Sequence, residues 1–104
     1  MNLRDLKYFI ALAETRHFGQ AAARSFVSQP TLSGQIKKLE DELGVTLFER
    51  SKKHVALTPL GEVLLPYARR TVEEAEALTQ LARASQDPLS GPLRLGVIPT
   101  LSPY

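Results

Sequence analysis

The sequence predicts a mainly α-helical fold, in which a winged helix-turn-helix precedes a long dimerisation (linker) helix. Three observations predict it. Two amphipathic segments, 17–25 and 28–43, are joined by a link that leaves room only for a tight turn. Two short segments with strand character flank a basic turn at 51–54. A helical pattern of about 25 residues then starts at Thr58-Pro59, which is long for a small globular domain.

The first two helices supply the support of the predicted motif. We expect the first helix from about Leu3 to Glu14, with an apolar side formed by Leu3, Leu6, Phe9, Ile10 and Ala13. The second helix spans about His17 to Ser25, and its small residues allow another helix to cross closely. Neither His17 nor Gly19 is a strong N-cap, and the turn after this helix lacks the usual glycine.

The third helix has the clearest pattern in the chain. Ser28 can cap its N-terminus, Pro30 suits its first turn, and Gly44 suits a left-handed C-cap. One face is apolar and carries Leu32, Ile36, Leu39 and Leu43. The opposite face is rich in hydrogen-bonding groups and carries Gln29, Thr31, Ser33, Gln35, Lys37 and Lys38. Such a helix suits a DNA major groove, but an ordinary helical hairpin in a small core is the alternative.

The next segment predicts a β-wing. Residues 46–50 and 55–57 read as strands, and the turn between them is basic. Lys52, Lys53 or His54 could lie on phosphates or in a minor groove. The alternative is a hairpin whose tip is only solvated.

The long helix is expected to run from Pro59 to about Ser85. Apolar and small residues recur on it near every 3.5 positions, at Leu64, Ala68, Thr71, Val72, Ala75, Leu78 and Ala82. This stripe predicts a homodimer interface, and the alternative is packing on a further part of the same protein. Pro66 removes one backbone hydrogen bond, so we expect a bend one turn upstream, near Glu62.

These features divide the chain into three parts. Residues 1–58 form the winged helix-turn-helix, and residues 59–86 form the linker helix. Residues 87–104 start as a hinge rich in proline, glycine and serine, and then alternate like a first strand. We expect them to be the hinge and first strand of a truncated effector-sensing domain.

Composition narrows the function classes. The net charge is +2, but residues 1–58 hold nine Lys and Arg against six Asp and Glu, so the basic excess lies in the first half. The chain has no cysteine, which excludes disulfide and thiol chemistry within it. His17 and His54 have no partner pattern, and no metal spacing or phosphate loop occurs. We therefore expect no enzyme and no cofactor, and a cytoplasmic protein without a membrane segment.

The combined motifs resemble the LysR-type transcriptional regulators. The matching residues are Phe18, Ala21, Ala22, Val27 to Pro30, Leu32, Ser33, Ile36, Leu39, Glu40, Leu43, Gly44, Leu47, Phe48, Arg50, Leu57 to Pro59 and Gly61. The resemblance covers residues 1 to about 86. It is closest to a peroxide-responsive member of the family, through Met1 to Leu6, Ser28 to Ile36 and Lys38 to Val45. A LysR-type regulator that senses a small metabolite is the alternative, and a winged-helix protein-interaction module is a more distant one.

The resemblance implies a double-stranded DNA partner with an approximately palindromic operator. It also implies a homodimer through the long helix and a tetrameric full-length protein, with the peroxide-reactive cysteines beyond Tyr104. The implied base contacts are Gln29, Pro30, Thr31, Ser33 and Gly34. The expected backbone contacts are Ser28, Gln35, Lys37, Lys38, Arg50, Lys52 and Lys53. Two positions depart from many relatives: Gly34 has no side chain to make a contact, and Lys53 lacks the planar fork of arginine.

Overall fold

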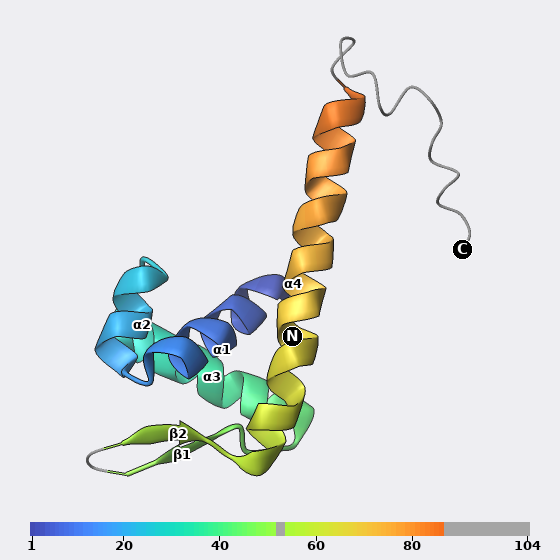
Figure 1. The fold of residues 1–104 in the computed structure, drawn as a ribbon. Coiled ribbons are helices and arrows are strands. Elements are labelled where there is room, and N and C mark those ends of the chain that lie inside the picture. Colours follow the sequence, from blue (N-terminus) through green and yellow to red (C-terminus); the bar gives the residue numbers. More distant parts are fainter. Residues whose placement is uncertain (52–53, 87–104) are drawn as a thin grey trace. The chain divides into compact units, whose positions relative to one another are not determined.

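The computed structural model describes residues 1–51 and 54–86. Its elements, in order, are helices α1 (Leu3–Thr15), α2 (Phe18–Arg24) and α3 (Gln29–Leu43), strands β1 (Phe48–Arg50) and β2 (Val55–Leu57), and helix α4 (Pro59–Ser85) (Figure 1). The chain divides into two compact units, Met1–Val72 and Glu73–Tyr104. The first unit holds α1 to α3, the wing and the first half of α4, and the described part of the second is the rest of α4. The predicted mainly α, winged architecture is therefore confirmed.

Each helix of the motif has a side-chain cap at its start. Asn2 and Asp5 form a reciprocal capping box at α1, with Asp5 N–H donating to Asn2 Oδ1 at 2.9 Å. His17 caps α2, because its Nδ1 accepts from Gln20 N–H at 3.0 Å. The expectation that α2 lacks an effective cap was therefore wrong, since an imidazole nitrogen can accept this bond as an oxygen would. Ser28 caps α3 through Thr31 N–H at 3.2 Å, as predicted.

The turn between α2 and α3 uses a left-handed residue without using glycine. Phe26 has φ of 58°, a conformation that L side chains rarely adopt, and its side chain is 94 % exposed. Backbone bonds from Phe26 N–H to Ala23 O (3.2 Å) and from Val27 N–H to Ala22 O (3.0 Å) hold the turn. Hydrogen bonding thus stabilises the predicted tight turn, although a residue other than glycine takes its left-handed position.

Helix α3 is anchored by its apolar face. Leu32, Ile36 and Leu39 are fully buried, as predicted. Leu43 was expected on the same face but is 41 % exposed, because the helix ends there and Gly44 turns the chain away with φ of 71°. The left-handed C-cap at Gly44 is confirmed.

The wing is shorter than predicted. Strands β1 and β2 pair antiparallel, with Phe48 opposite Leu57 and Arg50 opposite Val55. Thr46 and Leu47 were expected in the first strand but lie outside the ladder. Leu47 N–H donates to a side chain of α3 instead, and its carbonyl accepts from Thr58 N–H at 2.9 Å.

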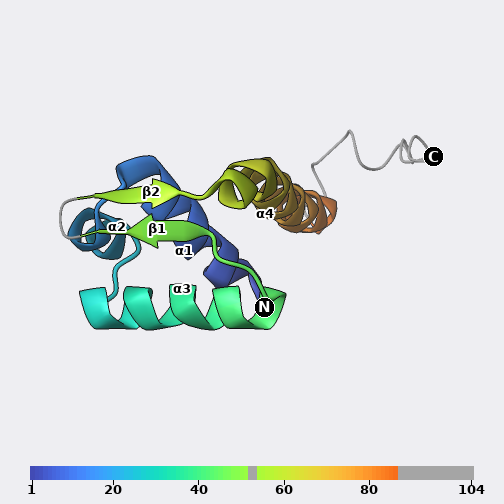
Figure 2. The ribbon, with the colours of Figure 1, turned by 90° about the horizontal axis from the view of Figure 1, so that it is seen from below.

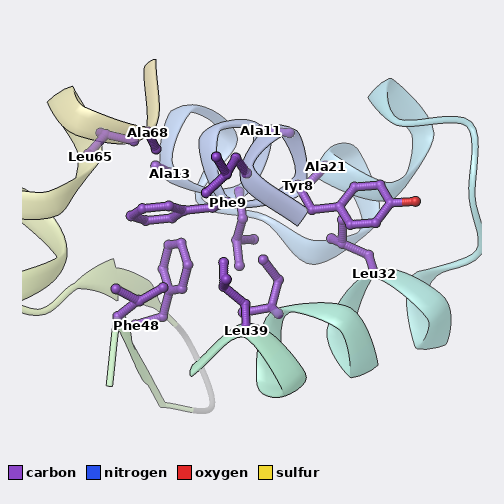
Figure 3. Close-up of a cluster of buried hydrophobic side chains, with 14 of the residues drawn as sticks. Tyr8, Phe9, Ala11, Ala13, Ala21, Leu32, Leu39, Phe48, Leu65 and Ala68 are labelled. Atoms are coloured by element: carbon purple, nitrogen blue, oxygen red, sulfur yellow. The ribbon is translucent and has the colours of Figure 1, made fainter. Parts of the chain in front are cut away.

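The core of the first unit joins every element of the motif. Phe9 of α1 and Phe48 of β1 meet edge to face, with ring centroids 5.6 Å apart. Figure 3 shows Leu39 of α3, and Leu65 and Ala68 of α4, around this pair. The start of α4 is therefore part of the same hydrophobic core as the helix-turn-helix.

Helix α4 is fastened to the wing at its first turn. The Thr58 hydroxyl donates to Thr46 O at 2.7 Å and accepts from Gly61 N–H at 2.9 Å. A Cβ on Gly61 would lie only 2.3 Å from Leu47 O, so this position requires glycine. The helix runs without interruption through Pro66, and the expected bend near Glu62 stays a prediction.

One buried carboxylate links α3 to the wing. Glu40 of α3 is 4 % exposed, and its Oε2 accepts from Leu47 N–H at 2.8 Å and Phe48 N–H at 3.1 Å. Its Oε1 accepts from Arg50 Nη2 at 3.2 Å. All the buried side-chain polar atoms of the described residues have a partner, so this charge is fully compensated.

We predict that Glu40→Ala lowers the free energy of unfolding by about 2–4 kcal/mol, because two buried N–H groups and Arg50 lose their acceptor. Glu40→Gln should cost less, since its amide oxygen can still accept from the two N–H groups. Urea unfolding monitored by circular dichroism measures both. The control is Asp41→Ala, whose exposed ion pair with Lys37 should matter by no more than about 0.5 kcal/mol. Equal losses for Glu40→Ala and Asp41→Ala would contradict the role given to Glu40.

Candidate nucleic-acid interface

The outer face of α3 is a polar surface on a regular helix. Figure 2 shows α3 along one edge of that unit. Six of the residues predicted to contact bases or phosphates are exposed on this helix, with Ser28 exposed at its cap and Ser33 and Gln35 half-buried. The six exposed residues on the helix are Gln29, Pro30, Thr31, Gly34, Lys37 and Lys38. The structure thus leaves most of the predicted contact residues of α3 open to solvent.

Hydrogen bonds at the N-terminus of α3 orient the first polar side chains. Ser28 Oγ accepts from Thr31 N–H and donates to Thr31 Oγ1 at 2.8 Å. Because each hydroxyl has one proton, Thr31 keeps its own proton to donate outward. The positive end of the helix dipole lies at the same place and favours a nearby anion such as a phosphate.

The basic residues of α3 lie on its C-terminal side. Lys37 is exposed and forms a loose pair with Asp41 at 3.7 Å, a contact of little strength in water. Lys38 is also exposed, and its charge lies near Glu42. A hydrogen bond from the Met1 ammonium, 2.9 Å away, is the main cause that lowers the pKa of the Glu42 carboxyl, and Lys38 adds a smaller effect. Lys37 and Lys38 therefore offer two exposed ammonium groups to the phosphates of a nucleic acid that lies along α3.

Arg50 has a partner that the sequence did not predict. Its guanidinium bonds the buried Glu40 and lies 5.7 Å from the centre of the Phe18 ring, and its side chain is 35 % exposed. These contacts fasten the wing to α2 and α3. Of the other predicted wing contacts, Lys52 and Lys53 lie outside the described residues. His54 is exposed, and its N–H donates to Ser51 Oγ at 3.0 Å.

Sequence reasoning missed two structural roles near the interface. Glu40 was matched only as a family residue, and its burial was not foreseen. The signal was present, because position 40 follows Leu39 and lies one turn beyond Ile36, beside the apolar stripe. The second is the exposed Phe26 in the turn, which no pattern of residue types indicates.

The seven side chains expected at a dimer interface differ in exposure. Ala68 and Val72 are only 5 % and 8 % exposed, because they pack in the core of the first unit. They can therefore offer little surface to a second subunit. Leu64 and Ala75 are half-buried, and Thr71, Leu78 and Ala82 are exposed. Large apolar side chains that the stripe did not include are also exposed on α4, namely Leu60, Val63, Tyr67 and Leu81.

None of the helices in 1–51 and 54–86 is both long and apolar enough to traverse a lipid bilayer. In the same residues, no three acidic or histidine side chains group closely enough to hold a metal ion.

Known proteins resemble this chain over its whole length. It is 53 % identical over all 104 residues to the DNA-binding transcriptional dual regulator OxyR of Escherichia coli K12, and 49 % identical to a hydrogen peroxide-inducible genes activator of Haemophilus influenzae. The chain spans about a third of these relatives, 34 % and 35 % of their lengths.

Solved structures agree with the fold. A full-length OxyR variant from Pseudomonas aeruginosa superposes with a TM-score of 0.81 at 52 % identity, over 84 % of this chain and 30 % of that one. The DNA-binding domain of CbnR, solved in a complex with DNA, gives a TM-score of 0.78 at 44 % identity, over 84 % of this chain and all of that one.

The family model for bacterial regulatory helix-turn-helix proteins of the lysR family matches residues 3–62. That span begins with α1, contains the capped reading helix and the wing, and ends in the first turn of α4. Since the match covers more than half of the sequence, this chain belongs to the lysR family of bacterial regulatory helix-turn-helix proteins.

Proposed function

We propose that this chain is the DNA-binding and dimerisation part of a LysR-type transcriptional regulator of the hydrogen peroxide response. The observation that carries the proposal is the outer face of α3, where a capped N-terminus, exposed amide and hydroxyl groups and two lysines share one rigid surface. The peroxide assignment is supported by the high identity to relatives named hydrogen peroxide-inducible genes activators. The chain itself has no cysteine, so no redox step is assigned to it.

In the proposed complex, α3 enters the major groove of duplex DNA. Gln29 can pair with the two hydrogen-bonding groups of an adenine edge, and Thr31 and Ser33 can bond either base type. Pro30 and Gly34 provide apolar surface among these polar side chains. Phosphates are held by Ser28, Gln35, Lys37 and Lys38, and on the wing by Lys52 and Lys53. We assign Arg50 first to holding the wing on Glu40, so its phosphate contact is secondary.

The long helix supplies the second half of the proposal. We infer that residues 1–58 read DNA, that 59–86 pair two chains, and that 87–104 lead into a sensing domain. The support for pairing is the row of exposed apolar side chains on α4, which water solvates poorly. A pair of chains presents two reading helices, so the operator should be roughly palindromic. The full-length protein is proposed to be a cytoplasmic tetramer, since two such dimers can bind adjacent sites on the chromosome.

Base reading and phosphate holding can be separated on α3. We predict that Gln29→Ala costs about 1–3 kcal/mol on a duplex selected from random sequence, and relaxes preference at one base pair. Lys38→Ala should weaken binding to selected and random duplexes alike, and lower the salt slope by about one. Titrations at several salt concentrations measure both. Equal losses on both duplexes for Gln29→Ala would remove it from base reading.

The dimer can be tested without disturbing the core. We predict that Leu78→Glu with Leu81→Glu converts the dimer to a monomer, because both side chains are exposed on α4 and a charge there would be buried on pairing. Thr79→Glu with Gln80→Glu is the matched control, since it adds the same two charges at exposed polar positions. Sedimentation equilibrium gives the mass. A wild-type chain that stays monomeric, or a double variant that still pairs, argues against the interface. Val72→Glu is unsuitable because Val72 belongs to the core.

Half-site spacing tests whether the two readers are held rigidly. We predict that adding about five base pairs between half-sites lowers dimer affinity toward the single-site value, because one half-site turns to the opposite face of the duplex. Adding about ten should restore part of the affinity. A titration series at fixed salt compares the spacers. Affinity that is indifferent to spacing would mean that α4 does not set the distance between readers.

A further inference from the structure

Gly34 stands in the middle of the reading helix although the fold does not need a glycine there. It is exposed, its backbone is helical, and a Cβ built on it would meet no atom within 4 Å. Glycine is the least favourable residue in a helix interior after proline. The fold would therefore accept alanine at position 34 and gain stability from it.

The other described glycines all have a structural reason. A Cβ on Gly61 would lie 2.3 Å from a backbone oxygen, and one on Gly19 would lie 2.9 Å from the His17 ring. Gly44 has φ of 71°, which L side chains rarely adopt. Among the glycines that the structure describes, only Gly34 is left without a reason inside the molecule. Its reason should then lie in what the molecule binds.

The position of Gly34 on the helix indicates where that ligand lies. With about 100° of rotation per residue, Gly34 points within about 15° of the direction opposite to the mean of Leu32, Ile36 and Leu39. It is therefore on the line of α3 that stands farthest from the core. Pro30 lies one turn earlier on nearly the same line, and Lys37 lies one turn later. A ligand that binds the outer face of α3 would come closest to the helix backbone along this line.

The groups that α3 presents along this line indicate which part of a ligand would lie against it. Inside a helix, the N–H and C=O of Gly34 are already bonded along the helix axis, so they offer nothing outward. The only group of Gly34 that faces outward is Cα. Pro30, one turn away, is exposed and presents only ring carbons. Pro30 and Gly34 thus form an apolar strip within a polar face. The apolar group of the major groove is the C5 methyl of thymine.

We propose that Gly34 is a specificity-determining residue, and that its bare backbone, beside the Pro30 ring, seats the methyl group of a thymine. The inference rests on the proposed DNA-binding function, which it deepens. A side chain at position 34 would occupy the space of the methyl group and hold the helix away from the base pair. The stability lost by having glycine in the helix is exchanged for recognition of one base.

The test uses duplexes selected from a random library by the whole chain. Each thymine of the selected half-site is replaced in turn by deoxyuridine, which lacks only the methyl group. We expect one replacement to weaken wild-type binding by about three- to tenfold, in line with one lost apolar contact. We expect Gly34→Ala to raise the melting temperature by a few degrees. Gly34→Ala should also weaken binding to the selected duplex about tenfold. For this variant, the same deoxyuridine replacement should cause almost no further loss of affinity.

Two controls separate stability from recognition. Thr79→Ala improves helix propensity at an exposed position of α4, and should leave affinity unchanged. Gly61→Ala should lower the melting temperature, in contrast to Gly34→Ala. The inference is overturned if Gly34→Ala binds the selected duplex as tightly as the wild type, or if it keeps the full sensitivity to deoxyuridine. A wild-type chain that selects no sequence at all would instead overturn the proposed function itself.

Discussion

The buried carboxylate of Glu40 is the interaction on which the rest of the reading surface depends. It joins α3 to the first residues of the wing and to Arg50. A charge with 4 % exposure is tolerated only when such partners surround it. Since those partners lie on the side of α3 that faces the wing, the opposite side is left to solvent and to a ligand. Glu40 thus adds an attachment to the wing to the anchoring that Leu32, Ile36 and Leu39 give the helix.

Helix α3 has to meet two demands at once. Its inner side is packed as tightly as any part of the molecule, with Leu32, Ile36 and Leu39 fully buried. Its outer side contains groups that are poor for stability, namely a glycine in the helix interior and two neighbouring lysines. A helix of this composition would be marginal in isolation. The core stabilises it, and this is why its outer residues are free to be chosen for binding.

The first half of α4 belongs to the winged domain. Thr58 and Gly61 fit its first turn against the chain that enters the wing, and Leu65, Ala68 and Val72 complete the core. Packed side chains therefore join the first half of α4 to the helix-turn-helix within the first unit.

The sequence by itself determined the elements of this fold. The Ser28 cap, Pro30, the spacing of Leu32, Ile36 and Leu39, and Gly44 predict α3 within a residue of its observed ends. This success has a local cause, because caps, helix period and left-handed termini depend on residues a few positions apart. The family motifs identified the reading helix for the same reason.

Only the tertiary structure decided which groups are used inside the molecule. Glu40 and Arg50 are ten positions apart in the sequence, yet they bond each other because the wing folds over α3. Ala68 and Val72 belong to a stripe that suits a partner helix, yet the molecule's own core buries them. The vacancy beside Gly34 is also visible only when its surroundings are known. These outcomes depend on contacts between segments distant in sequence, which no local pattern encodes.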